Sequence, residues 1–160
     1  MAVTIAIETP LQDDVRTLVA ALNEHLLPLS PVEFQFKMTV EQMAGADTNV
    51  FVARDEAGRA VGIGALKALS PTSGEVKRMY TLPEVRGLRV GSALLVAIED
   101  LARSRGITEL LLETGVGEGF EGAHRLYLRS GFASRGAFLD YPDSGHSAFF
   151  EKHLGSQAAA

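Results

Sequence analysis

The chain has 160 residues and a formal net charge of −5 at pH 7, from 15 Lys and Arg against 20 Asp and Glu. One domain is expected at this length, and the absence of cysteine excludes disulfides, a thiolate zinc site and a cysteine nucleophile. The acidic balance argues against nucleic acid as a partner, and no apolar run is long enough to span a membrane. Because the N-terminal segment also lacks the features of a secretory signal, the expected location is the cytoplasm.

The first half of the chain is expected to begin with a strand and a helix. The strand is expected at 3–7, where apolar residues alternate, and the helix begins after Pro10. The run Leu27-Pro28-Leu29-Ser30-Pro31 ends this helix, because proline lacks an amide donor and restricts the residue before it. A short helix at 40–43 follows, and then a strand at 50–53, a turn at 55–58 and a strand at 60–69, which together predict a hairpin.

The second half predicts a βαβ unit and a mixed sheet. A strand at 75–81 leads to a helix at 91–105 that Gly106 stops, and a buried strand follows at 110–112. A short helix that Gly131 closes and strands at 132–137 and 147–152 complete the pattern. We expect one α/β domain over 1–154, with a disordered tail at 155–160.

The loop between the strand at 75–81 and the helix at 91–105 is suited to bind a phosphate. Gly87 and Gly91 let a ligand approach the backbone, and the helix N-terminus offers free amides and a positive dipole end. Arg86 and Arg89 add positive charge. The alternative is that the two glycines only shape the turn from strand to helix.

The glycines of this chain do not complete either of two common nucleotide-binding motifs. A Walker loop requires a Gly-Lys-Ser or Gly-Lys-Thr ending, which this segment lacks. Gly115 and Gly117 begin a dinucleotide fingerprint, but Phe120 stands where its third glycine belongs. The first reading is excluded and the second is disfavoured.

The stretch Val-Lys-Arg-Met-Tyr at 76–80, with Arg-Gly-Leu-Arg-Val-Gly-Ser at 86–92, resembles the acetyl-coenzyme A signature of the GNAT family of N-acetyltransferases. The Leu-Tyr-x-x-x-Gly-Phe stretch at 126–132 is similar to a later motif of the same family. The resemblance implies a twisted mixed sheet of about seven strands flanked by about four helices. In that fold the parallel strands that begin at Glu75 and Thr108 splay apart to admit the cofactor.

The resemblance also implies how acetyl-coenzyme A is held as cosubstrate. Two departures from the family pattern are visible: glycine is usual where Arg89 stands, and Asn or Gln is frequent where Phe120 stands. The implied backbone contacts with pantetheine come from Met79, Tyr80 and Thr81, and the implied pyrophosphate contacts from Arg86, Gly87, Leu88, Arg89, Val90, Gly91 and Ser92.

Acetyl transfer to an alkylamine requires a base, because only about 0.1% of such an amine is neutral near pH 7.4. By the resemblance, Glu75 is the candidate base and Tyr127 the candidate proton donor to the departing thiolate. The alternatives are a Glu75 carboxylate paired with Lys77 or Lys67, and a Tyr127 that belongs to the core.

Three further residues have side chains that could contribute to a site. Glu113 is expected to form a structural ion pair with Lys77 or Arg78 rather than to act in catalysis. His25 and His146 could line an acceptor pocket, although a lone histidine is more often a surface or capping residue. The spacing of the histidines suggests no metal site.

The sequence therefore predicts an N-acetyltransferase that transfers the acetyl group directly to a small amine or amino-acid-like acceptor in a ternary complex. Without cysteine, an acetyl-cysteine intermediate is excluded. Two alternatives stay open: a non-catalytic domain that senses acyl-coenzyme A, and an acetyltransferase for protein N-termini or lysines. A homodimer is also left open.

Overall fold

The computed structural model describes residues 2–155 and contains one mixed seven-stranded sheet with strand order β1-β2-β3-β4-β5-β7-β6. Single 3₁₀ turns at Val32–Phe34 and Pro83–Val85 connect some of its elements. The strands are β1 (Thr4–Ile7), β2 (Thr48–Arg54), β3 (Ala60–Ala68), β4 (Ser73–Thr81), β5 (Glu109–Gly115), β6 (Ala133–Arg135) and β7 (Ser147–His153), and the helices are α1 (Asp13–Leu26), α2 (Val40–Met43), α3 (Val90–Ser104) and α4 (Glu121–Arg129).

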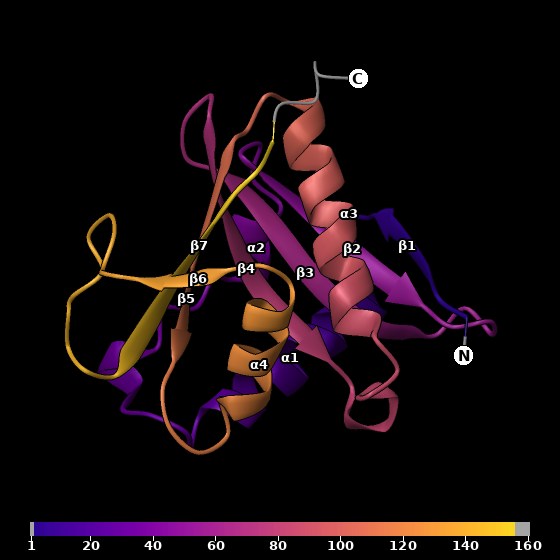
Figure 1. Cartoon of the computed structure of the whole chain (residues 1–160). Helices are drawn as coiled ribbons and strands as arrows, with labels where there is room; N and C mark the ends of the chain where they lie inside the picture. The colour runs from indigo at the N-terminus through magenta and orange to yellow at the C-terminus, as the bar shows by residue number, and fades with distance from the viewer. Residues whose placement is uncertain (1, 156–160) are drawn as a thin grey trace.

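Helices cover both faces of the sheet. Figure 1 shows α3 in front of the central strands, with α1 and α2 behind them. The two sides of the sheet accordingly hold separate apolar clusters, one beneath α3 and one beneath α1 and α2. Leu94 and Ile98 fill the centre of the first cluster, and Val15 and Leu18 fill that of the second. Helices α1 and α3 are thus each held by burial of one apolar stripe.

The expected helices and strands are confirmed in kind and order, and so is the expected fold class. The β-hairpin of β2 and β3 is present, and β4, α3 and β5 form the expected parallel βαβ unit. Pattern alone did not predict that β7 lies between β5 and β6. Of the expected disordered tail at 155–160, residues 156–160 lie outside the described residues.

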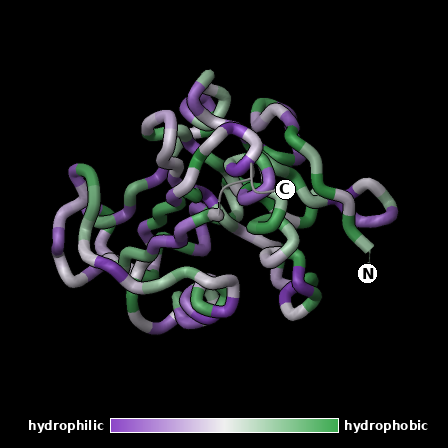
Figure 2. Tube along the Cα trace, turned by 45° about the horizontal axis from the view of Figure 1, so that its top comes forward, coloured by the Kyte–Doolittle hydropathy of each residue, from purple (hydrophilic) through white to green (hydrophobic). Residues whose placement is uncertain are grey.

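Figure 2 shows hydrophobic and hydrophilic segments interspersed along the described part of the trace. Within residues 2–155, no helix is long and apolar enough to cross a membrane.

The parallel pairing of β4 with β5 is short. It joins Ser73, Gly74 and Glu75 to residues 109–111 and then stops, although β4 remains paired with β3 as far as Thr81. In Figure 1 the two strands run together at first and are well apart at their C-terminal ends, with α4 beside the gap. The expected splay is therefore present, and one edge of β4 is free beyond Glu75.

A bulge interrupts β4 just beyond the splay point. Ala65 pairs with Lys77 and Ile63 with Tyr80, so two residues of β4 face one residue of β3. Arg78 takes up the extra length with a φ of 55°, which costs a non-glycine residue roughly 1–2 kcal/mol. Because of the bulge, Lys77 and Arg78 both project towards the α1 side of the sheet, where Arg78 contacts α1.

We predict that Ile98→Ala lowers the free energy of unfolding by about 2–4 kcal/mol, because it leaves a cavity between α3 and the sheet. Ile98 is 0% exposed and Val96, on the same helix, is 55% exposed. Val96→Ala is the matched control and should change stability by less than about 0.5 kcal/mol. Urea unfolding monitored by circular dichroism measures both, and equal effects of the two variants would contradict this packing.

Candidate active site

A cleft of about 700 Å³ opens where β4 and β5 diverge. On one side it is bordered by the end of α1 and residues 30–37, and on the other by the loop before α3 and by α4. Of the residues predicted for catalysis and cofactor binding, all but Leu88 line it. Leu88 is 46% exposed and lies outside the lining.

The loop before α3 presents unused backbone donors to this cleft. The α3 N-cap, Arg89, forms no side-chain capping bond, and the first helical amide hydrogen bond runs from Ala93 to Arg89. The amides of Val90, Gly91 and Ser92 are therefore left for a ligand or solvent. Together with the helix dipole they form an anion-binding end of the cleft.

Positive φ angles shape this loop at Gly87 and Arg89. Gly87 has φ 84°, and no atom lies close to the place where a Cβ would be. Arg89 has φ 66° although it is not a glycine. The left-handed conformation at Arg89 explains why glycine suits this position. The Arg89 side chain makes no hydrogen bond or ion pair with any residue in 2–155, so its guanidinium is available to a phosphate.

Arg86 contacts the end of β4 instead of pointing into the loop. Its guanidinium donates to the Thr81 carbonyl oxygen at 3.1 and 3.3 Å and lies 5.6 Å from the centre of the Tyr80 ring. These contacts hold the end of β4 against the loop that follows it.

The free edge of β4 suits a ligand rich in amides. Met79, Tyr80 and Thr81 border the cleft and have no β5 partner. The Met79 side chain lies on the α3 side of the sheet, against Gly64, so the contribution of this residue to the cleft is through its backbone. An extended amide chain along this edge would meet backbone donors and acceptors that no strand uses. A pantetheine arm that ends in phosphates fits the cleft by this criterion.

Glu75 is buried at the splay point within a group of three polar side chains. It is 2% exposed, and the Tyr141 hydroxyl donates to its Oε2 at 2.6 Å. Lys77 lies 3.2 Å from the same oxygen and donates to Tyr141 at 2.8 Å. No hydrogen-bond partner of Oε1 is found within the described part of the chain. One oxygen is fixed by its neighbours, and the other is left for a ligand.

The expectation that Glu113 forms an ion pair with Lys77 or Arg78 is wrong. Lys77 pairs with Glu75 instead, and neither Lys77 nor Arg78 pairs with Glu113 in the described residues. The Ser147 hydroxyl donates to Glu113 at 2.7 Å. The pKa of Glu113 is raised, chiefly because burial disfavours its charged form. Strand β7, inserted beside β5, supplies the partner that the sequence pattern did not place there.

Tyr127, in α4, packs its ring against the core and also borders the cleft. It packs edge-on against Phe132 and near Phe150, and it also lines the cleft. Burial, with a smaller contribution from the charge of Glu113, raises its pKa well above 10. No hydrogen-bond partner of its hydroxyl is found among residues 2–155. The side chain is therefore a protonated donor with no acceptor in the described part of the chain.

Phe120 fills the end of the cleft between β5 and α4. A Cβ added at Gly115 would meet the Phe120 ring at 2.3 Å, so this glycine is needed for the ring to lie there. Where the family often has a polar amide, this chain presents an aromatic surface that lines the cleft.

The two histidines occupy different positions. His25 lines the cleft, and burial, followed by the charge of Arg86, lowers its pKa. His146 stacks on Phe34 at a ring separation of 4.6 Å and is not among the cleft lining. Of the two, only His25 is placed to meet a ligand in the cleft.

Tyr141 and Asn23 are site residues that the sequence did not predict. Tyr141 lies in an irregular loop between β6 and β7, and no local pattern indicates that it reaches Glu75 on β4. Asn23 is a polar residue beside the apolar stripe of α1, and its side-chain oxygen accepts a hydrogen bond from Arg78. A polar residue at the border of a buried stripe is a weak signal for such a contact.

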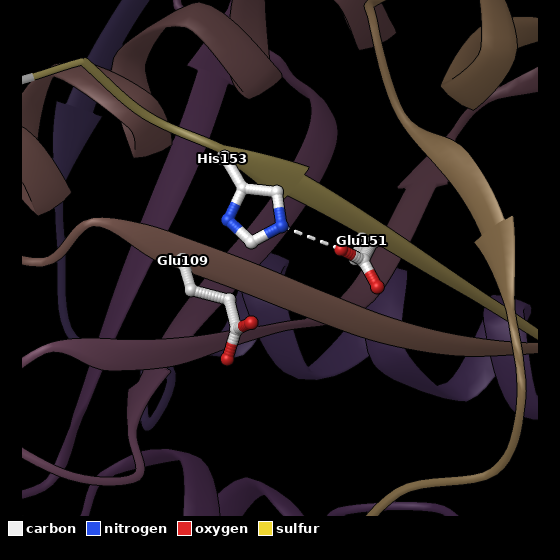
Figure 3. A group of neighbouring side chains, drawn as sticks. All are labelled: Glu109, Glu151 and His153. Atoms are coloured by element: carbon white, nitrogen blue, oxygen red, sulfur yellow. Dashed lines mark hydrogen bonds and ion pairs between the residues drawn. The ribbon is translucent and has the colours of Figure 1, made fainter.

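A second group of titratable side chains lies outside the cleft. Figure 3 shows Glu109, Glu151 and His153 on neighbouring strands, and their potential ligand atoms lie within 4.8 Å of one another. His153 already contacts Glu151 at 2.6 Å, and Arg135 lies 3.6 Å from the same carboxylate. These contacts account for the group as a surface charge network.

Comparison with known proteins gives consistent results. Residues 18–132 match the sequence profile of the Acetyltransferase (GNAT) family. A protein of Azospirillum brasilense named IAA acetyltransferase is 43% identical over 153 residues, which cover 95% of this chain and 98% of that protein. The solved structure of a candidate acyl-CoA N-acyltransferase from Klebsiella pneumoniae has 34% identity and a TM-score of 0.78, with 96% of this chain and 98% of that one covered.

A more distant structure shares the fold. It is an aminoglycoside 6'-N-acetyltransferase complexed with coenzyme A, with 15% identity and a TM-score of 0.74, and 96% of this chain and 98% of that one are covered.

We predict that Arg89→Gly weakens coenzyme A binding about three- to tenfold, because it removes an exposed charge at the phosphate end of the cleft. The melting temperature of the Arg89→Gly variant should not fall, since glycine accepts φ 66° without strain. Arg89→Lys, which keeps the charge, should bind nearly as tightly as the parent. Calorimetric titration with coenzyme A measures both variants. Unchanged affinity in Arg89→Gly would remove this residue from the phosphate contacts.

Proposed function

The chain belongs to the acetyltransferase (GNAT) family, and from this premise we propose that it transfers the acetyl group of acetyl-coenzyme A directly to the amine of a small acceptor in a ternary complex. The observation that carries the proposal is the early divergence of β4 and β5, which opens a cleft beside the buried carboxylate of Glu75. Cosubstrate and acceptor can then reach the same point from opposite ends of one cleft.

Acetyl-coenzyme A, when bound, supplies an activated thioester carbonyl. The chain's own part is to hold it in place. The free edge of β4 at Met79, Tyr80 and Thr81 is proposed to pair with the pantetheine amides, and the loop at 86–92 to receive the pyrophosphate. Such positioning of two reactants converts a bimolecular reaction into a local one.

Glu75 is proposed as the general base that accepts the amine proton. Its position is fixed by Tyr141 and Lys77 through Oε2, which leaves Oε1 for the acceptor nitrogen or an intervening water. General-base assistance contributes typically about 10²–10⁴-fold. Glu113, on the opposite strand, is the competing candidate, because it also lines the cleft and its raised pKa makes its carboxylate a stronger proton acceptor than an ordinary one.

Tyr127 is proposed as the donor that protonates the departing thiolate. Its raised pKa keeps the phenol protonated through neutral and moderately alkaline pH, which is the form that a donor requires. It lines the cleft from α4, across from β4. A protonated amine loses two protons over one turnover: one offsets the proton that Tyr127 gives to the thiolate, and the other leaves through Glu75 to solvent.

The acceptor is proposed to be a small molecule. The relative from Azospirillum brasilense is named IAA acetyltransferase. The cleft volume of about 700 Å³ also falls in the range typical of small-molecule sites. A panel of amines with release of free thiol as the readout tests the activity. Binding of acetyl-coenzyme A without thiol release on any amine would instead indicate a sensing domain.

We predict that Glu75→Gln lowers kcat about 10²-fold or more with an alkylamine acceptor and much less with a weakly basic aromatic amine. The alkylamine is almost wholly protonated at neutral pH and requires the base, whereas the aromatic amine is already neutral. Thiol release measures both rates. The matched control is Glu113→Gln on the facing strand, which should not separate the two acceptors.

An equal loss with both acceptors in Glu75→Gln would contradict the base assignment and indicate structural damage. Acetyl-coenzyme A affinity and the melting temperature, measured on the same variant, report such damage directly.

For Tyr127→Phe we expect kcat to fall about 10- to 10²-fold while acetyl-coenzyme A affinity stays within about twofold, since only a hydroxyl without a protein partner is removed. Because the tyrosine pKa is raised, the parent should show no loss of rate from its ionisation up to at least pH 10. Initial rates and calorimetry measure these quantities. Turnover equal to that of the parent would remove Tyr127 from the mechanism.

A further inference from the structure

Arg78 is a buried cation in the cleft, and residues 2–155 supply no countercharge to it. It is 9% exposed and lines the cleft, and its Nη2 donates to the neutral side-chain oxygen of Asn23. No carboxylate forms an ion pair with it among residues 2–155, and its Nε is buried with no hydrogen-bond partner. Burial lowers the pKa of Arg78 to about 10, so the guanidinium is still charged at neutral pH.

The backbone adds a second unfavourable feature at the same residue. Arg78 occupies the bulge of β4 with φ 55°, a conformation that favours glycine. Buried arginines are ordinarily paired, and left-handed non-glycine residues are uncommon. Both features occur in one residue that lines the cleft. Such unfavourable features are typical of functional sites, which points to a ligand that completes this one.

Arg78 is not placed to bind the pyrophosphate of the cosubstrate. The phosphate end of the cleft lies at the N-terminus of α3, with Arg89. Arg78 instead projects from β4 towards α1, where it meets Asn23. Lys77, its neighbour in sequence, is already engaged by Glu75 and Tyr141. Arg78 is therefore an unpaired cation on the α1 side of β4, apart from the phosphate end of the cleft.

We propose that Arg78 binds a carboxylate of the acceptor, and that the acceptors of this protein are amino acids or closely related amines that carry a carboxylate. The inference rests on the proposed function, because it identifies the substrate class of the same site. Arg78 and Glu75 stand three positions apart on one strand and both line the cleft, so an acceptor held by its carboxylate at Arg78 can present its amine to Glu75.

The rest of the α1 side favours an apolar side chain on this acceptor. Phe34 and Phe36 line the cleft there, and Phe36 packs edge-on against Tyr141 at 5.2 Å. Gln35, between them, has a buried Oε1 with no partner in the described chain, which can accept an N–H from a ligand. An aromatic or aliphatic amino acid meets these three features together.

The reaction balances without another reactant. The amine nitrogen forms a bond to the acetyl carbonyl carbon, and the carbon–sulfur bond of the thioester breaks. The ammonium gives one proton to Glu75, which releases it to solvent. The second nitrogen proton, lost as the amide forms, balances the proton that the sulfur takes from Tyr127. The carboxylate at Arg78 is unchanged, and the products are an N-acetyl amino acid and coenzyme A.

The first test compares amino acids with the amines that remain when the carboxylate is removed. The pairs are alanine with ethylamine, leucine with 3-methylbutylamine, phenylalanine with phenethylamine, and tryptophan with tryptamine. For at least one pair, the parent should show kcat/KM about 10²-fold higher with the amino acid. Arg78→Gln should lose about that factor on the amino acid and change less than about threefold on the amine.

Two further variants keep this test sound. Arg78→Gly also removes the charge but suits the positive φ, so it reports on recognition even if Arg78→Gln folds poorly. Arg16→Gln removes one positive charge from the outside of α1 and should leave both rates unchanged. Equal rates on both members of every pair in the parent, or equal losses on both in the Arg78 variants, would overturn the inference.

A binding experiment separates this inference from the proposed function. In the presence of coenzyme A, calorimetry should show that 3-phenylpropanoate or 4-methylpentanoate binds more tightly than its amide, and that Arg78→Gln abolishes the preference. If this holds while no amine is acetylated, the proposed function fails and the carboxylate site stands. If amines are acetylated but neither carboxylate binds better than its amide, the proposed function stands and the carboxylate site is refuted.

Discussion

The parallel pairing of β4 with β5 ends at Glu75, and the site depends on this early end. A strand in a sheet normally satisfies the backbone groups on both of its edges. Beyond Glu75, β4 keeps β3 on one side and has no strand from residues 2–155 on the other, so this edge is open to a ligand over residues 76–81. The divergence creates the cleft, exposes the strand edge and brings the proposed base to its margin.

The bulge at Arg78 gives the cleft its chemical character. A regular strand would point Lys77 and Arg78 to opposite faces, so that one of them would enter the apolar core beneath α3. With the bulge, both side chains lie on the α1 side, where Lys77 fixes Glu75 and Arg78 finds no countercharge in the described part of the chain. One extra residue in β4 therefore gives Lys77 and Arg78 different roles: Lys77 positions the proposed base, and Arg78 is proposed to bind the acceptor.

Much of this arrangement is accessible from the sequence. Apolar periodicity predicts α1 and α3, and the glycines and arginines of 86–92 indicate the anion-binding end of the cleft. What the sequence does not reveal depends on long-range pairing. The insertion of β7 beside β5 brings Ser147 to Glu113, and the loop that holds Tyr141 reaches Glu75 across 66 positions. The bulge at Arg78 also lacks a local signal, because the usual marker of a positive φ is glycine.

The central claim is that acetyl passes directly from cosubstrate to acceptor within this cleft. Initial rates of thiol release, measured while acetyl-coenzyme A and the acceptor amine are both varied, test it most directly. Direct transfer in a ternary complex predicts double-reciprocal lines that intersect. Parallel lines, together with acetyl label retained on the protein in the absence of acceptor, would show a covalent acetyl-enzyme and contradict the account.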